Sequence, residues 1–472
     1  MSAYRPQPAA PAAPSRSDLA QYRDELGERG LPDMQGAVVA LLADLWRWAA
    51  DGRDAPLRKR RRPGLRLVPS LVKPLTALDA ALRSAPTSPG ARVDAAQAAH
   101  DLAERLDAAG AEETAWGFYA AAAAVAPDEH AYAAAAGRFE RRHQRYTAAA
   151  QWLARAARLA DRAGRSMDAT AALIALAGTV EDQEHHALSA RLLAFAARYA
   201  RHRRAPLGEG DALLALGLQR HGLGYTAEAH GFFTDAVLAY GTDHPRLVRA
   251  GLEIGRCWLD EAEFVATLKL HEVLLRHVSA PLDAMLAAAR LTRAAAATGS
   301  EQLMEEWWNG TMRFLGMVPT GVATATALVD LARAAGTWGL RVRARVAAEA
   351  ALALAQEASD PVLTSAAAYI MAITTLPRVP VELARTVFPD IPGDDDGDDD
   401  AEQEDAWAED AGAADASEED PWKEVHVEQD WEATAPLDMD PMNPALEPLF
   451  NAITCGLGPR GSGSEPPLVP RG

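Results

Sequence analysis

In two places a carboxylate precedes a histidine by four residues, a spacing that could put two metal ligands on one face of a helix. Glu181 precedes His185, and Asp182 precedes His186 in the same way. A zinc site needs a third and a fourth ligand with matching geometry, and the neighbouring sequence offers none. We therefore interpret the four residues as solvated helix residues and predict no metal site.

Nucleophilic and phosphate chemistry also finds little support in the sequence. Cys257 lies beside Trp258 in an apolar stretch without a readable Cys/His/Asn grouping, which favours a packed thiol over a nucleophile. The sequence contains no phosphate-binding loop, no dinucleotide fingerprint after a strand, no nucleophile elbow and no HExxH motif. We predict no catalytic residue, no cofactor and no enzymatic activity. Trp307, Trp308 and Trp338 are interpreted as packing residues and not as ligand-stacking residues.

Arginine is concentrated in three clusters, at 58–62, 141–145 and 201–204. Each cluster lies at or near an expected helix end, where a cation interacts favourably with the helix dipole, so solvated or capping roles are favoured. Docking of an acidic segment and binding of nucleic acid are the alternatives. Nucleic acid is the less favoured of the two, because residues 1–389 carry 42 acidic and 44 basic residues and are nearly neutral.

The net charge of −19 belongs to the C-terminal end of the sequence. Residues 390–472 contain 24 acidic and 3 basic residues. Charge this dense does not form a packed core, so the sequence predicts a disordered acidic tail. Residues 461–472 end in Leu-Val-Pro-Arg-Gly, which looks like a thrombin-type cleavage sequence, and they are left out of the functional argument.

The acidic tail contains large apolar side chains that are unusual in disordered segments. Three tryptophans are flanked by carboxylates, and residues 444–454 place apolar residues at helical spacing. Such a composition is typical of short motifs that dock into a basic groove with apolar pockets. The expected docking residues are Trp407, Trp422, Trp431, Leu446, Leu449 and Phe450. A purely solubilising tail is the alternative.

The elements that position these residues are expected to be helices, because Ala is abundant and aromatic residues make up only 6% of the chain. Helices are predicted over 17–29, 33–50 and 70–83. Four glycines then recur in mid-helix settings, at Gly137, Gly178, Gly217 and Gly255. Glycine inside a helix costs about 0.8–1 kcal/mol relative to Ala, so a regular series of them predicts close contact with a neighbouring helix.

If each of these glycines is placed at position 8 of a repeating unit, the units begin at residues 130, 171, 210 and 248. A further unit begins at residue 96. In the unit from 210, the residues at positions 4, 7, 20, 24 and 27 are Leu213, Leu216, Ala229, Phe233 and Ala236. Residues 96–281 thereby resemble the tetratricopeptide repeat (TPR) family. The resemblance implies an all-α fold, a right-handed solenoid of helix hairpins with 34–41-residue units. Its first helices would line a concave groove for peptides or partner helices.

The resemblance also implies which residues face the groove. They are His100, Glu104, Arg138, Arg141, Thr179, Asp182, Leu214, Leu218, His221, Arg249 and Arg256. Members that bind chaperones use a Lys/Asn/Arg clamp for a C-terminal carboxylate. This sequence departs from that clamp, because His100 and Glu104 occupy positions 5 and 9 of the unit from 96. We therefore expect no chaperone binding by that route.

Beyond residue 281 the glycine and alanine pattern is lost, although helical pairs continue. They are expected over 282–297 with 300–315, 322–335 with 338–358, and 361–375. The predicted organisation is a disordered arm (1–16), a helical segment with a basic loop (17–90), TPR-like repeats (91–281), degenerate helical repeats (282–389) and the acidic tail (390–472).

These features predict a non-enzymatic protein–protein interaction scaffold or adaptor that binds a partner protein or peptide in its groove. The acidic tail would be a second docking element or a self-masking one. The alternatives are a peptide- or ligand-sensing TPR regulator, and a regulated component or substrate of a bacterial defence or protease system. No apolar run is long enough for a membrane span, so we expect a cytoplasmic protein without a membrane partner. The preference for Ala and for Arg over Lys is typical of high-GC bacteria.

Overall fold

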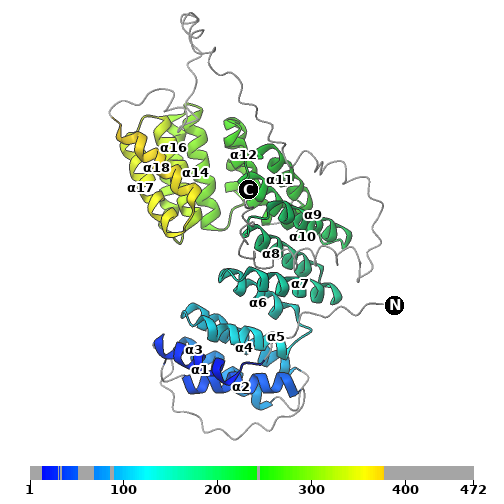
Figure 1. Ribbon diagram of the computed structural model, residues 1–472. Coiled ribbons are helices and arrows are strands. Elements are labelled where there is room, and N and C mark those ends of the chain that lie inside the picture. The colour runs from blue at the N-terminus through cyan, green and yellow to red at the C-terminus, as the bar shows by residue number, and fades with distance from the viewer. Residues whose placement is uncertain are drawn as a thin grey trace, which may run out of the picture. The chain divides into compact units, whose positions relative to one another are not determined.

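The computed structural model describes residues 13–29, 31, 35–51, 69–84, 90–241 and 245–376 (Figure 1). Within these ranges the chain forms eighteen α-helices and no β-strand, which confirms the predicted all-α class. Most of the N-terminal arm, the Arg58–Arg62 loop and the whole acidic tail lie outside them, so the predictions for Trp407, Trp422, Trp431, Leu446, Leu449 and Phe450 do too.

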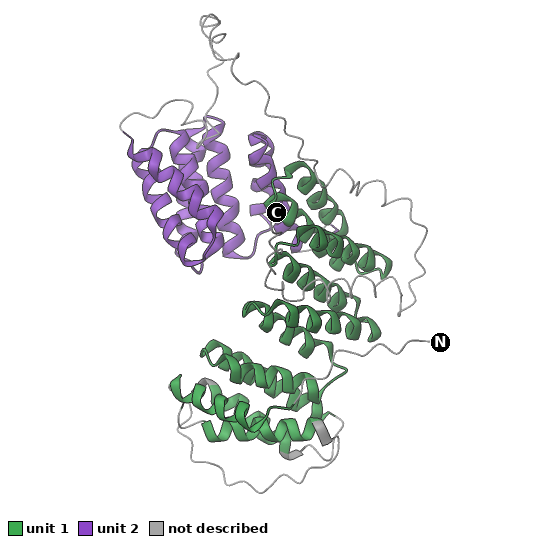
Figure 2. Cartoon of the chain, in the orientation of Figure 1, with its two compact units in different colours: residues 1–240, 444–472 green, residues 241–443 purple. Residues whose placement is uncertain are grey.

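The described helices fall into two compact units that divide at residues 240 and 241 (Figure 2). Unit 1 contains α1 (Arg16–Glu28), α2 (Gln35–Asp51), α3 (Pro69–Ser84), α4 (Ala91–Ala108), α5 (Glu112–Val125), α6 (His130–Arg142), α7 (Tyr146–Arg162), α8 (Ser166–Glu181), α9 (His186–His202), α10 (Pro206–Gly222) and α11 (Thr226–Tyr240). Unit 2 contains α12 (Arg246–Asp260), α13 (Phe264–Leu275), α14 (Pro281–Ala297), α15 (Glu301–Leu315), α16 (Val322–Thr337), α17 (Arg341–Glu357) and α18 (Pro361–Thr375).

Consecutive helices pack as hairpins, and each hairpin packs on the next one of its unit. The hairpins of unit 1 are α4–α5, α6–α7, α8–α9 and α10–α11, and those of unit 2 are α12–α13, α14–α15 and α16–α17. Each unit is therefore a TPR-like stack of helix hairpins, as the repeat pattern predicts. The change of sequence pattern near residue 281 remains a predicted boundary.

Each first helix ends at a residue with positive φ. Gly224, for example, has a φ of 86°, and the next amide, of Tyr225, donates to the carbonyl oxygen of Arg220 at 3.0 Å. This backbone bond is that of the Schellman motif. The same arrangement follows the other first helices at intervals of 34 to 40 residues, at residues 110, 144, 184, 224, 262, 299 and 339. It also follows the second helices α7, α9 and α17, at residues 164, 204 and 359. The repeat thus continues to α16–α17, where the glycine and alanine pattern of the sequence has been lost.

Three of the four mid-helix glycines allow close contact between the two helices of a hairpin. A Cβ atom on Gly137 would lie 2.7 Å from Cγ of Leu153, and one on Gly217 would lie 2.5 Å from the ring of Phe233. At Gly255 the nearest atom would be Cε1 of His271, at 1.9 Å. These contacts confirm the reason that the sequence suggests for the glycines.

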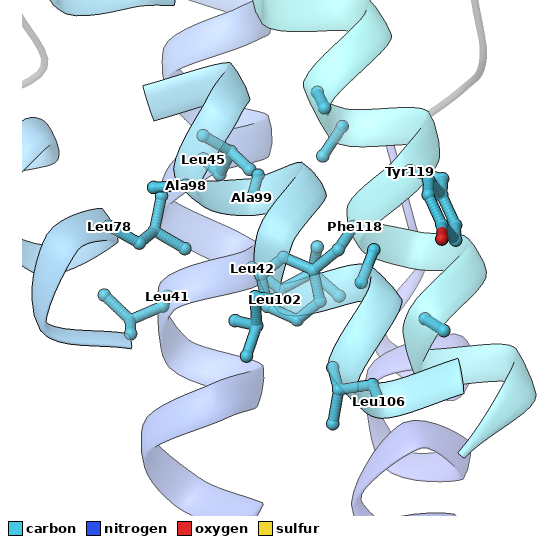
Figure 3. Close-up of a cluster of buried hydrophobic side chains, with 14 of the residues drawn as sticks. Leu41, Leu42, Leu45, Leu78, Ala98, Ala99, Leu102, Leu106, Phe118 and Tyr119 are labelled. Atoms are coloured by element: carbon cyan, nitrogen blue, oxygen red, sulfur yellow. The ribbon is translucent and has the colours of Figure 1, made fainter. Parts of the chain in front are cut away.

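The hairpin α4–α5 shares a core with the N-terminal helices. Leu42 of α2, Leu78 of α3, Leu102 of α4 and Phe118 of α5 are fully buried in one apolar cluster (Figure 3). A carboxylate adds a polar link, because Glu25 of α1 accepts hydrogen bonds from the first turn of α5. The amides of Glu113 and Thr114 donate to it at 2.9 and 2.8 Å. The N-terminal helices therefore cover the first hairpin.

The glycine contact in α10 predicts opposite effects for two similar substitutions. Gly217→Ala should lower the free energy of unfolding by about 1–3 kcal/mol, because the buried ring of Phe233 must move. Gly231→Ala, in α11, should raise it by up to about 1 kcal/mol, because its Cβ would meet nothing within 4 Å and Ala favours the helix. Chemical denaturation followed by circular dichroism measures both. Equal effects of the two substitutions would contradict the packing role of Gly217.

Candidate protein interaction faces

Neighbouring first helices lie side by side within each unit. In unit 1, α6 contacts α8 and α8 contacts α10, and in unit 2, α12 contacts α14 and α14 contacts α16. We call the row formed by α4, α6, α8 and α10 the first-helix face of unit 1. Residues spaced by three and four share one side of a helix, so this face brings together several residues that the sequence analysis selects.

His100 and Glu104 of α4 lie together at one end of this face. Nε2 of His100 is 3.4 Å from Oε1 of Glu104, and the centre of the imidazole is 5.6 Å from that of the Tyr119 ring and 6.1 Å from that of the Tyr132 ring. Burial lowers the pKa of His100, and the charge of Glu104 opposes that effect. Arg138 of α6 is exposed and forms no ion pair with a described residue.

Arg141 and Asp182 form a two-pronged ion pair that joins α6 to the end of α8. Nε of Arg141 donates to Oδ2 of Asp182 at 2.6 Å, and Nη2 donates to Oδ1 at 3.1 Å. Gly178 makes room for this pair, since a Cβ there would lie 2.6 Å from Nη1 of Arg141. The expectation that Gly178 receives a neighbouring helix is corrected here, because it receives a guanidinium group.

The remaining predicted residues of unit 1 differ in accessibility. Thr179 is fully buried, and its hydroxyl donates to the carbonyl oxygen of Ala175 at 2.9 Å. Leu214 is also buried, so neither side chain presents itself to a partner, which corrects the sequence prediction for both. Both lie on the side of their helix that packs against its neighbours. Leu218 and His221 of α10 are half-buried and stay candidates.

The basic clusters at 141–145 and 201–204 are largely matched by carboxylates within unit 1. Arg142 pairs with Asp107, and Nε of Arg145 is 2.6 Å from Glu140. In the later cluster, Arg203 is 2.6 Å from Asp161, and Arg201 is 2.7 Å from Glu209. Two of these four pairs join one helix to another, Arg203–Asp161 joins the turn after α9 to α7, and Arg145–Glu140 joins α6 to the turn that follows it. The arginines therefore hold neighbouring helices together.

The carboxylate–histidine pairs do not lie on a single helix. α8 ends at Glu181 and α9 begins at His186, and Glu184 between them has a φ of 64°. The interpretation of Glu181 and His185 as neighbours on one helix is therefore wrong. Among the described residues, no group of three or more His, Cys, Asp or Glu could hold a metal ion.

Cys257 is fully buried in unit 2, and burial raises the pKa of its thiol to about 12. A thiol in this state stays protonated at neutral pH, which agrees with a packing role. The later tryptophans also pack. Trp338 donates from Nε1 to the carbonyl oxygen of Ala296 at 3.1 Å, and Trp308 packs on the core of α16–α18.

Unit 2 contains a buried arginine cluster that the sequence analysis missed in part. Arg290 of α14 is 2% exposed and donates to the carbonyl oxygen of Leu252. Its Nη2 lies 4.0 Å from Oε1 of Glu253, whose other oxygen is 2.8 Å from Nη2 of Arg256. Two guanidinium groups thus share one carboxylate. Burial lowers the pKa of Arg290, and the charge of Glu253 opposes that effect.

A second pair continues the cluster toward α16. Nη1 of Arg293 is 3.5 Å from Oδ1 of Asp330, and both side chains are buried. Arg333 follows Asp330 by three residues on the same side of α16. The sequence did carry a signal for these residues. Arg290, Arg293, Asp330 and Arg333 interrupt helices that are otherwise rich in Ala and Leu, and such helices are buried nearly all round.

Comparison with known proteins finds similarity only among solved structures. No family model and no curated protein matches the chain. PilF of Pseudomonas aeruginosa is 15% identical, with 48% of this chain and 99% of that chain covered and a TM-score of 0.35. A Rap protein complexed with competence and sporulation factor is 12% identical, with coverages of 73% and 98% and a TM-score of 0.38. None of the described helices is long and apolar enough to cross a bilayer.

His271, which lies near the arginine cluster, makes stability depend on pH. Burial and the charge of Arg290 lower its pKa from 6.5 to about 3, so the folded chain keeps the imidazole neutral. The unfolded chain binds a proton below its ordinary pKa, and acid therefore favours unfolding. Between pH 7 and pH 5 this residue alone should remove about 2 kcal/mol of stability.

His271→Gln should flatten that dependence, whatever its effect on stability at pH 7. Urea denaturation of both proteins at pH 7 and pH 5, at one ionic strength, gives the two differences. A pH difference as large in the variant as in the parent would show that His271 does not carry this effect.

Proposed function

We propose that the chain is a non-enzymatic protein-interaction scaffold of the tetratricopeptide type. In this proposal, the first-helix face of unit 1 binds a segment of a partner protein. The observation that carries it is the alignment of first helices in a stack of hairpins, which repeats the same side of each helix along the face. The accessible residues offered there are Glu104, Arg138, Leu218 and His221.

The accessible residues of this face suit a partner of mixed character. Arg138 supplies an exposed positive charge, and Glu104 supplies a negative charge that His100 only partly engages. Leu218 supplies partly exposed apolar surface on α10. The ion pair between Arg141 and Asp182 holds α6 and the end of α8 together, so the two helices form a fixed support for the bound segment. A row of fixed helices can bind an extended peptide or a helix along its length. Because the row is already ordered, binding costs little conformational entropy in this protein.

The acidic tail, in the same proposal, is a second docking element that can mask a basic surface of its own chain. Charge complementarity supports this role, because the tail contains 24 acidic residues against 3 basic ones. A tethered segment meets its site at a high effective concentration, so weak contacts suffice for masking. An external partner would then compete with the tail for that surface.

Charge reversal on the first-helix face tests partner binding. Peptides selected from a random displayed library on the full-length protein should bind Arg138→Glu about tenfold more weakly, a loss of about 1.4 kcal/mol. Arg162→Glu is the matched control, because Arg162 is an exposed arginine of α7, a second helix of the same unit. Binding affinities come from isothermal titration. Equal binding to both variants would contradict the proposed face.

A selected peptide should also stabilise the folded protein. At a hundredfold excess over its Kd, a ligand that binds only the folded state raises the free energy of unfolding by about 2.7 kcal/mol. Denaturation with and without the peptide measures this shift. A shift that survives unchanged in Arg138→Glu would place the peptide elsewhere.

A further inference from the structure

The basic clusters of unit 1 and the arginines of α12 and α14 in unit 2 differ in how many carboxylates pair with them. In unit 1, the arginines at 141, 142, 145, 201 and 203 each have a carboxylate within ion-pair distance. In unit 2, Arg256 and Arg290 share the single carboxylate of Glu253, and Arg249 is exposed and forms no ion pair with a described residue. The basic clusters at 141–145 and 201–204, which are the easiest to see in the sequence, are therefore more fully neutralised than the arginines of α12 and α14.

The arginines of the first helices of unit 2 lie on one side of those helices. Spacings of three and four residues place them on corresponding stripes of α12, α14 and α16. We call this side the arginine face. Its exposed or partly exposed arginines are Arg246, Arg249, Arg256 and Arg333, whereas Arg290 and Arg293 are buried. The acidic residues on the same stripes are Glu253, Asp260, Asp283 and Asp330. Six positive charges thus meet four negative ones.

Burial strengthens the effect of this excess. Arg290 is 2% exposed, and its Nε, like that of Arg256, is buried without a hydrogen-bond partner. A buried cation that lacks full compensation is costly, and the low dielectric around it projects its field toward the surface. Arg256, which is 31% exposed and shares Glu253 with Arg290, is the point where an external carboxylate can reach this charge.

We propose that the arginine face of unit 2 binds the aspartate run 394–400 of the same chain. This inference rests on the self-masking role of the tail proposed above, and it names the surface that the tail covers. The run contains six aspartates and one glycine, without a basic residue. Its only strong complement is a surface with positive charge in excess.

The spacing of the charges is compatible with such a complex. Arg249 and Arg256 are seven residues apart on α12, which places them about 10 Å apart along the helix axis. In a polyproline II conformation, with three residues per turn and a rise of about 3.1 Å, Asp395 and Asp398 would lie about 9 Å apart on the same side of the chain. Two carboxylates of the run can thus meet both arginines at once.

The tether reaches this surface without any assumption about the placement of unit 1. α18 ends at Thr375 in unit 2 and contacts α16, and α16 contacts α14. The run begins 18 residues after Leu376, and a chain of that length spans up to about 60 Å. Linkers of this kind give effective concentrations of the order of 1 mM, enough for a weak ionic contact to be occupied.

Arginine footprinting of the full-length protein tests the proposal. Phenylglyoxal modifies accessible guanidinium groups, and mass spectrometry follows the rate at each arginine. Arg249 and Arg256 should react at least about threefold more slowly in the parent protein than in a variant with the six aspartates of 394–400 changed to asparagine. Arg162, which is exposed on α7, is the internal control and should react equally in both.

A synthetic peptide of residues 393–405, added to the six-asparagine variant, should restore protection of Arg256 at low ionic strength. It should lose that effect in 0.5 M salt, where the Debye length is about 4 Å. Arg249→Gln in the six-asparagine background should weaken the restoration, since it removes an exposed charge that forms no ion pair with a described residue. Circular dichroism checks that this variant folds.

Two outcomes would overturn the inference, and they have different meanings for the proposed function. Protection of Arg138 in place of Arg249 and Arg256 would put the tail on unit 1, so the arginine face fails while self-masking stands. Equal rates at every arginine in parent and variant would remove self-masking as well. Neither outcome affects peptide binding on the first-helix face, which the Arg138→Glu comparison decides separately.

Discussion

The stacking of this protein depends on one backbone arrangement that follows each first helix from α4 to α16. A residue adopts positive φ, and the amide after it bonds to a carbonyl oxygen five residues earlier. The direction in which the second helix leaves is thereby fixed. Because the arrangement follows the first helices at intervals of 34 to 40 residues, each first helix presents the same side. Gln144 and Ala262 adopt this conformation although a left-handed residue with a Cβ costs about 1–2 kcal/mol, so packing between helices, more than local preference, maintains the turn.

The sequence predicted the helices and the hairpin class because Ala content and 3–4 spacing are local signals. It also predicted the reason for Gly217, since a glycine that recurs in mid-helix needs a neighbour that excludes a side chain. It did not reveal the turn at Glu184, because no glycine or proline marks that residue. As a result, Glu181 and His185 looked like neighbours on one helix. Thr179 and Leu214 were misplaced for a related reason, since a family pattern gives unit positions but not the rotation of each helix.

Charge was the least predictable property. Composition shows that residues 1–389 are almost neutral in total. This total does not show which arginines are paired with carboxylates and which are not. Pairing depends on contacts between residues about 40 positions apart, such as Arg141 with Asp182 and Arg293 with Asp330. A count of charges carries no information about such distances. The informative signal was positional, because Arg290 stands among alanines and leucines on a helix with little exposed surface.

The cap that Glu25 places on α5 has a consequence for how such a repeat array can grow. α5 is buried along nearly its whole length, with α1 and α2 on it and α6 after it, so the first hairpin has no open side to which another hairpin could attach. A copied hairpin added ahead of α4 would have to displace both the carboxylate and the apolar core around Leu42. The N-terminal helices therefore occupy the side of the first hairpin on which a preceding hairpin would stack.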